Sequence, residues 1–424
     1  MTSPSFPGPD DITRRVLPNG IVVLHRANMN SLSVVVTGYL SVGSIFEADA
    51  KLGLAGFTAQ ALMRGTMEHD FQQVYDALES NGASFGIDGG MHSTGFFGNA
   101  LAEDLDLLIG TLAEIVRQPA FPNDQVERLR AQLLTSLAIR AQDTSEVATL
   151  AFNGLVYAGH PYSRPEDGYP ETVKAITRQE LVEFHRKYFG PRGMVISIVG
   201  GVKAEKALDS VSRFLGDWEN PLQSSQPDLP AVKPVNGIVR RQVNIPGKSQ
   251  ADLVMGVAGP PRRAADYLAA SVGNNILGQF GMFGRIGESV REQAGLAYYA
   301  SSSLSGGIGP GPWLFIAGVD PKDIDQVISL IRKEISRFIS ESVSSEELAD
   351  SQANYIGRLP LSLESNVGVT AALVSLERYN LGLDYYLRYA DLIRAISATD
   401  ILEAAKHYLN PDSLAIATAG TFED

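Results

Sequence analysis

The sequence repeats itself at a spacing of about half its length. Residues 169–201, YPETVKAITRQELVEFHRKYFGPRGMVISIVGG, return as YADLIRAISATDILEAAKHYLNPDSLAIATAG at residues 389–420. Tyr169 then aligns with Tyr389 and Pro191 with Pro411, at a constant offset of 220 residues. This period far exceeds the roughly 20–50 residues of solenoid repeats, so the repeating unit is a whole domain.

Each copy predicts the same local structure. Thr177 or Ser397 is placed to cap an amphipathic helix, which is followed by a proline-containing turn and an apolar strand. Near the start of each half, NGIVV and NGIVR open β-branched runs that suit edge strands. Between the halves, residues 218–235 contain four prolines and several polar residues, which indicates a semi-extended linker. We therefore predict two homologous domains, residues 1–217 and 236–424, joined by this linker.

Strand patterns precede helix patterns within the first half. This order predicts an α+β fold, in which a largely antiparallel sheet carries helices on one face. In the second half, SESVSSEELADSQ predicts a helix capped by Ser344 or Ser345, with Glu347 in the first turn. The first half is expected to place strands at 21–27 and 32–40 and helices at 53–65, 71–81, 102–117 and 122–142.

Composition excludes several classes of function. The net charge of −13, with no block rich in lysine or arginine, argues against nucleic-acid binding. The chain has no cysteine, which excludes disulfides, thiolate metal ligands and a cysteine nucleophile. No stretch approaches the ~20 apolar residues of a membrane span, and the N-terminus lacks the apolar core of a secretory signal. We expect a cytoplasmic protein, although a chain whose signal has been removed would give the same pattern.

A set of segments resembles one family of peptidases over nearly the whole chain. In their order and spacing they are similar to the M16 metallopeptidases (pitrilysin and mitochondrial processing peptidase), specifically the short, two-domain M16B branch. The resemblance implies two homologous α+β domains that form half of a clamshell chamber around a peptide. The segments are LPNGIVVL, VGSIFE, GLAGFTAQALMRGT, LESNGASFGIDGG, HPYSRPEDGYPETVKAITRQEL and RIGESVREQAGLAYYASS.

The zinc motif of the family is missing from this chain. Family enzymes carry H-x-x-E-H on the helix that GLAGFTAQALMRGT occupies, where two imidazoles bind Zn²⁺ and the carboxylate activates water. The matching positions are Gly56, Ala59 and Gln60. The family's third ligand is a glutamate in a later helix; Glu127 is an acid early in that helix, but residues 128–142 contain no Asp or Glu. We therefore expect no metal in this chain.

The histidines do not compensate for the missing motif. None of the six is separated from another by three or four residues, the spacing at which two imidazoles share one helix face. We expect His160 to stabilise a turn or make a buried hydrogen bond, and His185 to be structural.

The resemblance implies that Arg291 and Tyr298 are the candidate catalytic and substrate-binding residues. In active relatives this pair donates hydrogen bonds to the peptide backbone and to the carbonyl oxygen under attack, which suits a guanidinium and a phenol. A surface arginine and a strand-packing tyrosine are the plainer interpretation. Gly281 and Gly284, in GQFGMFGRIG, are candidate peptide contacts, although a simple link after a helix explains the stretch as well. That stretch lacks the G-K-[ST] ending of a phosphate loop.

Half of an active site predicts a subunit rather than a complete enzyme. We expect this chain to bind peptide, by addition to an edge strand, and to supply Arg291 and Tyr298. A homologous M16 subunit that carries H-x-x-E-H would form a heterodimer with it and supply zinc catalysis. The alternative is a catalytically inactive structural or assembly protein that resembles the core subunits of respiratory complexes. Retention of the Arg/Tyr pair favours the first hypothesis.

Overall fold

The computed structural model describes residues 6–279 and 284–422 and divides into two compact units. Unit 1 consists of residues 1–137, 165–228 and 359–388, and unit 2 of residues 138–164, 229–358 and 389–424. Packing thus groups the chain differently from the sequence repeat, because one short segment from each half belongs to the unit of the other half. Residues 216–238, which include the expected linker, contain no helix or strand.

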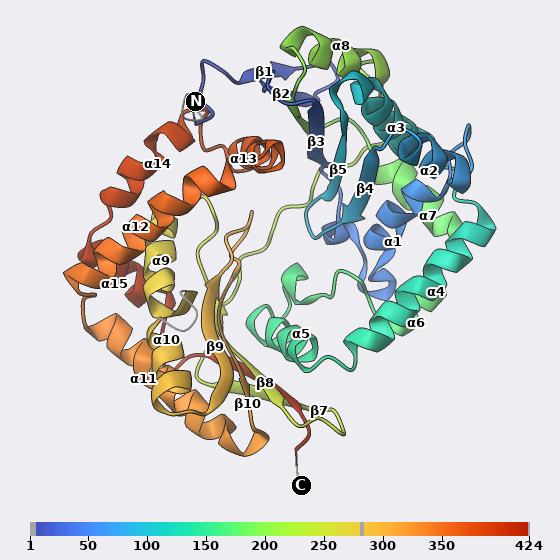
Figure 1. The fold of residues 1–424 in the computed structure, drawn as a ribbon. Coiled ribbons are helices and arrows are strands. Elements are labelled where there is room, and N and C mark those ends of the chain that lie inside the picture. Colours follow the sequence, from blue (N-terminus) through green and yellow to red (C-terminus); the bar gives the residue numbers. More distant parts are fainter. Residues whose placement is uncertain (1–5, 280–283, 423–424) are drawn as a thin grey trace. The chain divides into compact units, whose positions relative to one another are not determined.

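Unit 1 contains a six-stranded sheet of order β1-β2-β6-β3-β5-β4 (Figure 1). All neighbouring strands are antiparallel except β2 and β6, which are parallel. Because β1 pairs with β2, the prediction that the NGIVV run forms an edge strand is wrong. The strands are β1 (Thr13–Val16), β2 (Val22–Ala27), β3 (Ser33–Leu40), β4 (Ser84–Gly89), β5 (Thr94–Leu101) and β6 (Val195–Gly200).

Unit 2 contains a five-stranded sheet that repeats this topology. Its order, β7-β11-β8-β10-β9, corresponds to β2-β6-β3-β5-β4, and its single parallel pair, β7 with β11, corresponds to β2 with β6. Here the NGIVR run leads into an edge strand, as predicted. The duplicated, largely antiparallel fold is therefore confirmed. The strands are β7 (Val239–Asn244), β8 (Ala251–Ala258), β9 (Ala297–Leu304), β10 (Pro312–Val319) and β11 (Ala415–Gly420).

The helices begin at the capping residues that the repeat predicts. Thr177 caps α7 (Arg178–Tyr188) and Ser397 caps α15 (Ala398–Tyr408), each in a reciprocal capping box with an acid three residues later. The helices expected in the first half are confirmed as α1 (Leu54–Ala61), α2 (Phe71–Glu79), α3 (Leu105–Arg117) and α4 (Asn123–Arg140). The others are α5 (Thr144–Val156), α6 (Pro170–Ala175), α8 (Ala204–Leu215), α9 (Tyr267–Asn274), α10 (Arg285–Gly287), α11 (Ile324–Ser340), α12 (Ser345–Ser362), α13 (Asn366–Tyr379) and α14 (Tyr385–Arg394).

Within the described ranges, no single helix is both long and apolar enough to cross a bilayer. Helices α12 and α13 satisfy length and composition only as a pair, and a bend of 114° separates them.

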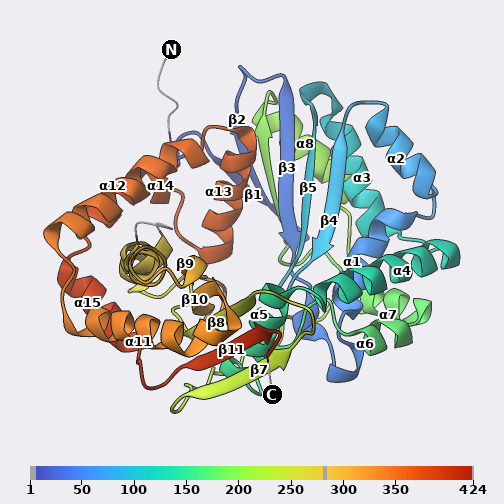
Figure 2. The same cartoon turned by 60° about the horizontal axis from the view of Figure 1, so that its bottom comes forward.

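The sheet of unit 1 is covered by helices on both faces (Figure 2). Val34 and Val36 of β3 and Ile198 of β6 belong to a core shared with residues of α3 and α8. The alternate residue Val35 is also buried, and α13 packs on β3 and β6. The expectation of helices on only one face is therefore wrong, because α13 arrives from the second half of the sequence.

The sheet of unit 2 is built in the same way. Met255 and Phe315 share a core with residues of α9, α11 and α15, whereas Val254 and Ala417 share another with Phe152 of α5. Figure 1 shows α5 and α11 on opposite sides of this sheet. Residues Ala251–Val257 of β8 and all of β11 are buried, the pattern of strands covered on both faces. Alanines at 415, 417 and 419 line the face on which α5 packs.

Candidate functional site

Helix α1 of unit 1 carries the three positions of the degenerate zinc motif. It begins after Gly53, whose φ of 92° lies in the left-handed region, and a short 3₁₀ turn extends it to Gly65. The buried carboxylate of Glu47 accepts hydrogen bonds from the backbone N–H groups of Gly53 (3.1 Å) and Ala55 (2.5 Å). An anion at this end satisfies free N–H groups and complements the helix dipole. The helix predicted between Gly53 and Gly65 is confirmed.

None of the three motif positions carries a metal-binding side chain. Gly56 has no side chain, and the methyl group of Ala59 is fully buried. The Gln60 side chain donates from Nε2 to Asp88 Oδ1 on β4 at 3.2 Å. Helix α1 and β4 approach closely through glycine, because a Cβ on Gly89 would lie 2.8 Å from Gly56 Cα. These residues do not fit a zinc ion, and no catalytic step through a metal follows from them.

Helix α4, where the family's third ligand is expected, presents a cation beside α1. Glu127 is exposed and forms two 3.0 Å bonds with Arg130, which lowers the pKa of its carboxyl group. The Arg130 guanidinium lies 5.2 Å from the ring centroid of Phe57 on α1 and donates a hydrogen bond to the Val173 carbonyl. Glu127 is thus engaged in an ion pair on its own helix. A positive charge packed on α1 disfavours a divalent cation there.

Three acids lie near α1 without forming a ligand set. Burial raises the pKa of Glu166, and the neighbouring charges of Asp167 and Asp88 raise it further. Asp88 is bonded to Gln60 and to the backbone N–H of Gly89. Their oxygens are not gathered within 4.8 Å of one another, so this group gives unit 1 negative charge rather than a metal site.

The one close grouping of three metal-ligating side chains in the described ranges is Glu68, His69 and Glu114. His69 Nδ1 lies 2.8 Å from Glu114 Oε1, and this partner raises the pKa of the imidazole. Thr66 donates its hydroxyl to the same Glu114 oxygen and accepts from the backbone N–H groups of residues 68 and 69. An ion pair that holds a turn explains this geometry fully. Sequence reasoning did not find it because Glu114 is 45 residues away from His69.

In unit 2, Arg291 and Tyr298 lie on one short connected segment. Arg291 belongs to a π-helix, Glu288–Gln293, a rare conformation that is frequent at functional sites. Its side chain is 38% exposed, and the nearest acid is Glu292 at 3.9 Å. Gly295 then adopts φ 66°, and β9 begins at Ala297. The predicted order of helix, glycine turn and strand is confirmed.

A β-bulge sets the direction of the Tyr298 side chain. Gly318 pairs with Tyr299 and Val319 with Ala297, so Tyr298 is the additional residue at the shift in register. Its side chain is 71% exposed. Bulges are frequent beside active sites, where they redirect a side chain. Both candidate residues of unit 2 therefore present hydrogen-bond donors to solvent.

Strand β9, which contains Tyr298, is anchored by a buried acid that the sequence did not predict. Asp252 of β8 is 4% exposed and accepts hydrogen bonds from the hydroxyl groups of Tyr299 and Thr144. Burial and the Asp252 carboxylate raise the pKa of the Tyr299 phenol. These contacts join β9 to β8 and to the start of α5. The only sequence signal was an acid within an otherwise apolar strand.

The two glycine candidates have different outcomes. Gly281 lies outside the described residues. At Gly284 a Cβ would meet Gly278 Cα at 2.6 Å, and at Gly278 a Cβ would meet the backbone N of Ser302 at 2.6 Å. Gly278 and Gly284 are therefore required for close backbone packing, which is sufficient reason for glycine at both positions.

Two histidines have the structural roles that the sequence predicted. Buried His160 accepts from Tyr162 N–H at Nδ1 (3.1 Å), and its Nε2 lies 3.1 Å from the Pro230 carbonyl. His185 Nε2 lies 2.9 Å from the Val116 carbonyl, and burial lowers the pKa of the imidazole to about 4. Each ring is held as a neutral donor to a carbonyl oxygen.

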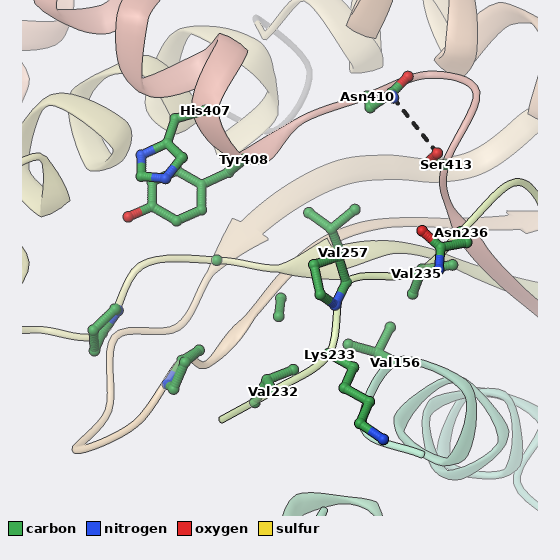
Figure 3. A pocket seen from close by; sticks show the side chains of 15 residues that line it. Val156, Val232, Lys233, Val235, Asn236, Val257, His407, Tyr408, Asn410 and Ser413 are labelled. Atoms are coloured by element: carbon green, nitrogen blue, oxygen red, sulfur yellow. Dashed lines mark hydrogen bonds between the residues drawn. The ribbon is translucent and has the colours of Figure 1, made fainter. Parts of the chain in front are cut away.

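A hollow of about 530 Å³ in unit 2 contains none of the predicted site residues (Figure 3). Figure 3 shows the His407 ring stacked on that of Tyr408, with Val257 and Val232 on the walls. His407 and Tyr408 both bond to Asp266 at 3.1 Å, and Ser413 is bonded to Asn410 instead. In this hollow His407 and Ser413 are thus bonded to different partners.

Comparison with known sequences identifies the same family in both halves. The family model described as insulinase (peptidase family M16) matches residues 22–165. The model described as the peptidase M16 inactive domain matches residues 175–355. An uncharacterised zinc protease of Mycobacterium leprae is 26% identical over 357 residues, which cover 84% of this chain and 80% of the relative. One from Mycobacterium tuberculosis is 24% identical over 402 residues, covering 94% and 90%.

Solved structures share the fold. A peptidase M16 inactive domain from Pseudomonas fluorescens is 23% identical, with a TM-score of 0.90 over 97% of this chain and 98% of that chain. A protease from Helicobacter pylori is 18% identical, with a TM-score of 0.88 over 98% and 100%. At these identities the likeness establishes the architecture alone, because one fold can support many functions.

Proposed function

Because the chain belongs to the M16 peptidase family, we propose that it is the substrate-binding, non-zinc subunit of a two-chain peptidase of the M16B branch. A homologous subunit with an intact H-x-x-E-H motif would bind the metal and activate the water. This chain would bind the peptide and donate hydrogen bonds to it. The observation that carries the proposal is the contrast between α1, without ligands, and the exposed donors Arg291 and Tyr298.

The two donors suit a peptide carbonyl group whose oxygen becomes negative during hydrolysis. The guanidinium of Arg291 offers several N–H groups in a fixed fork, and the phenol of Tyr298 offers one O–H. Donors aimed at developing charge stabilise the transition state more than the ground state. Their loss should therefore reduce kcat more than it raises KM.

An edge strand beside these donors supports binding of an extended peptide. Within the described sheets, β9 pairs only with β10, and Tyr298 lies at the start of β9. An extended segment can add to a free strand edge through main-chain hydrogen bonds, which depend little on sequence. Unfolded polypeptide is the substrate class that such binding favours.

The test is reconstitution with an M16 chain that carries H-x-x-E-H. Alone, this chain should bind no stoichiometric zinc and cleave no fluorogenic peptide. Mixed with that chain, it should give a peptidase that EDTA inactivates. Tyr298→Phe should lower kcat by about a hundredfold to a thousandfold, because removal of one oxyanion donor has this order of effect. Tyr169→Phe, at a tyrosine 48% exposed in unit 1, is the matched control and should keep full activity.

The alternative, a structural or assembly subunit, makes the opposite prediction. Its pairing with the second chain would depend on surfaces other than the Arg/Tyr pair. Tyr298→Phe and Arg291→Ala would then leave the turnover of the mixed chains unchanged. Zinc in the isolated chain, with EDTA-sensitive cleavage, would contradict both functions.

A further inference from the structure

Arg285, six residues before Arg291, is a buried cation with a directional anchor. Its residue is 9% exposed, and its guanidinium makes two parallel bonds to Glu347 of α12, from Nε to Oε1 (2.7 Å) and from Nη2 to Oε2 (2.9 Å). The guanidinium also lies 5.6 Å from the ring centroid of Phe338 on α11. Its remaining group, Nη1, is buried without a hydrogen-bond partner.

The acceptor of this ion pair is itself held in place. Glu347 Oε2 accepts from the backbone N–H of Ser344 at 2.8 Å, while Ser344 Oγ accepts from the backbone N–H of Glu347. The predicted cap is thus Ser344, in a reciprocal arrangement with Glu347. The Arg285 hydrogen bond is the main cause of the low pKa of Glu347, about 2. The Glu347 carboxylate therefore both caps the N-terminus of α12 and accepts the two hydrogen bonds from Arg285.

The segment that begins at Arg285 leads directly to Arg291. Helix α10 continues into the π-helix Glu288–Gln293, and this stretch packs on α11. Ile286 and Val290 are fully buried, whereas Arg291 is exposed. Buried apolar side chains hold such a segment against the core through a non-directional interaction, which constrains its rotation about its own axis less tightly than a directional bond does. A forked ion pair has a direction and can define that rotation.

We propose that Arg285 is a positioning residue, which through Glu347 fixes the orientation in which Arg291 is presented to the peptide. The catalytic part of this inference rests on the proposed function. The structural part, that the ion pair orders residues 288–298, does not depend on a partner chain.

The energetics of buried ion pairs indicate which variant separates a positioning role from a purely stabilising one. Replacing such a pair by neutral side chains of similar volume often leaves stability unchanged or increases it, whereas removing one partner leaves an unpaired buried charge. We therefore choose the double variant Arg285→Met/Glu347→Gln. Methionine can fill the space over Phe338, and the glutamine carbonyl can still accept from Ser344 N–H. The control is Arg332→Met/Asp412→Asn, at a more exposed ion pair of 2.7 Å in the same unit.

The first measurement is backbone hydrogen exchange of residues 288–298 in the isolated chain. The double variant should fold with an unchanged Tm and exchange at least tenfold faster in this segment, while the control keeps the wild-type rates. Unchanged exchange in the double variant would overturn the inference. A fall in Tm with faster exchange throughout unit 2 would also overturn it, because the pair would then serve stability alone.

The second measurement is turnover of the reconstituted enzyme. The kcat of the double variant should fall at least tenfold, with less than a twofold change in KM. Arg285→Lys keeps the charge but not the forked geometry, so its kcat should fall less than that of the double variant. Full turnover in the double variant would overturn the inference. Wild-type chains that pair but cleave nothing would refute the proposed function instead, and the exchange result would still decide the role of Arg285.

Discussion

Single residues determine how stability responds to pH, and Glu347 gives the clearest case. Its pKa of about 2 in the fold, set first by the Arg285 hydrogen bond, lies below the ordinary glutamate value of about 4.5. Between these values the unfolded chain binds a proton that the folded chain does not. The stabilisation is therefore complete above pH about 4.5 and is lost as the pH falls toward 2.

The expected loss is about 2 kcal/mol of unfolding free energy, after allowance for the partial exposure of the carboxylate. Urea unfolding at pH 6 and pH 3 would measure it. Glu347→Gln should remove this part of the pH dependence, whereas Glu341→Gln, at an exposed carboxylate paired with Arg337, should change the slope little. An equal fall between pH 6 and pH 3 in wild type and Glu347→Gln would contradict the assignment.

The limits of sequence reasoning at this scale follow from distance along the chain. Gly56, Ala59 and Gln60 could be located because a helix motif has fixed spacing, and Ser344 because a cap is local. The pairs His69 with Glu114, Tyr299 with Asp252 and Arg285 with Glu347 join residues 45 to 62 positions apart. No local pattern encodes such a meeting, since it depends on how elements pack.

Helices α7 and α15 allow the duplication to be tested element by element. Thr177→Ala and Ser397→Ala each remove the side-chain acceptor of one reciprocal cap. Each should cost about 1 kcal/mol of unfolding free energy, measured by chemical denaturation. Ser336→Ala, at an exposed position inside α11, is the control and should be neutral or slightly stabilising, because alanine is the better helix former. If all three variants lost a similar unfolding free energy, the effect would come from removal of any serine or threonine hydroxyl and not from loss of a cap.

The elements themselves could largely be predicted from the sequence, but their layering could not. Strand and helix positions followed from alternation, capping residues and glycines. The burial of a second sheet face by α5 and α13 did not, because an apolar helix stripe shows that something covers it without showing what. Strand β1 was not predicted beside β2 either, because its four residues, TRRV, are too few to show a clear alternation.

At the scale of the whole molecule, each unit depends on a segment from the other half of the sequence. A cut in the expected linker would give residues 1–217 without α13 and residues 236–424 without α5. Each fragment would expose one apolar face of its sheet. We expect neither fragment alone to show dispersed amide signals by NMR, and co-expressed fragments to associate and recover them.

A control for the cut tests whether the break itself does harm. Cleavage of the intact, folded chain near residue 225, within the segment that has no helix or strand, leaves every helix in place and should preserve the fold. A well-folded fragment 1–217 would show that α13 is dispensable for the first sheet.

The dependence of the first sheet on α13 also sets an order of events during synthesis. Strands β1 to β6 are complete by residue 200, yet the helix that packs on β3 and β6 begins at Asn366. Domains generally fold as they emerge from the ribosome, N-terminal parts first. Unit 1 must wait through about 165 further residues with valines of β3 and β6 uncovered. A ribosome that pauses in that interval therefore leaves an aggregation-prone nascent chain. A chaperone bound to the uncovered face would have to leave when α13 arrives.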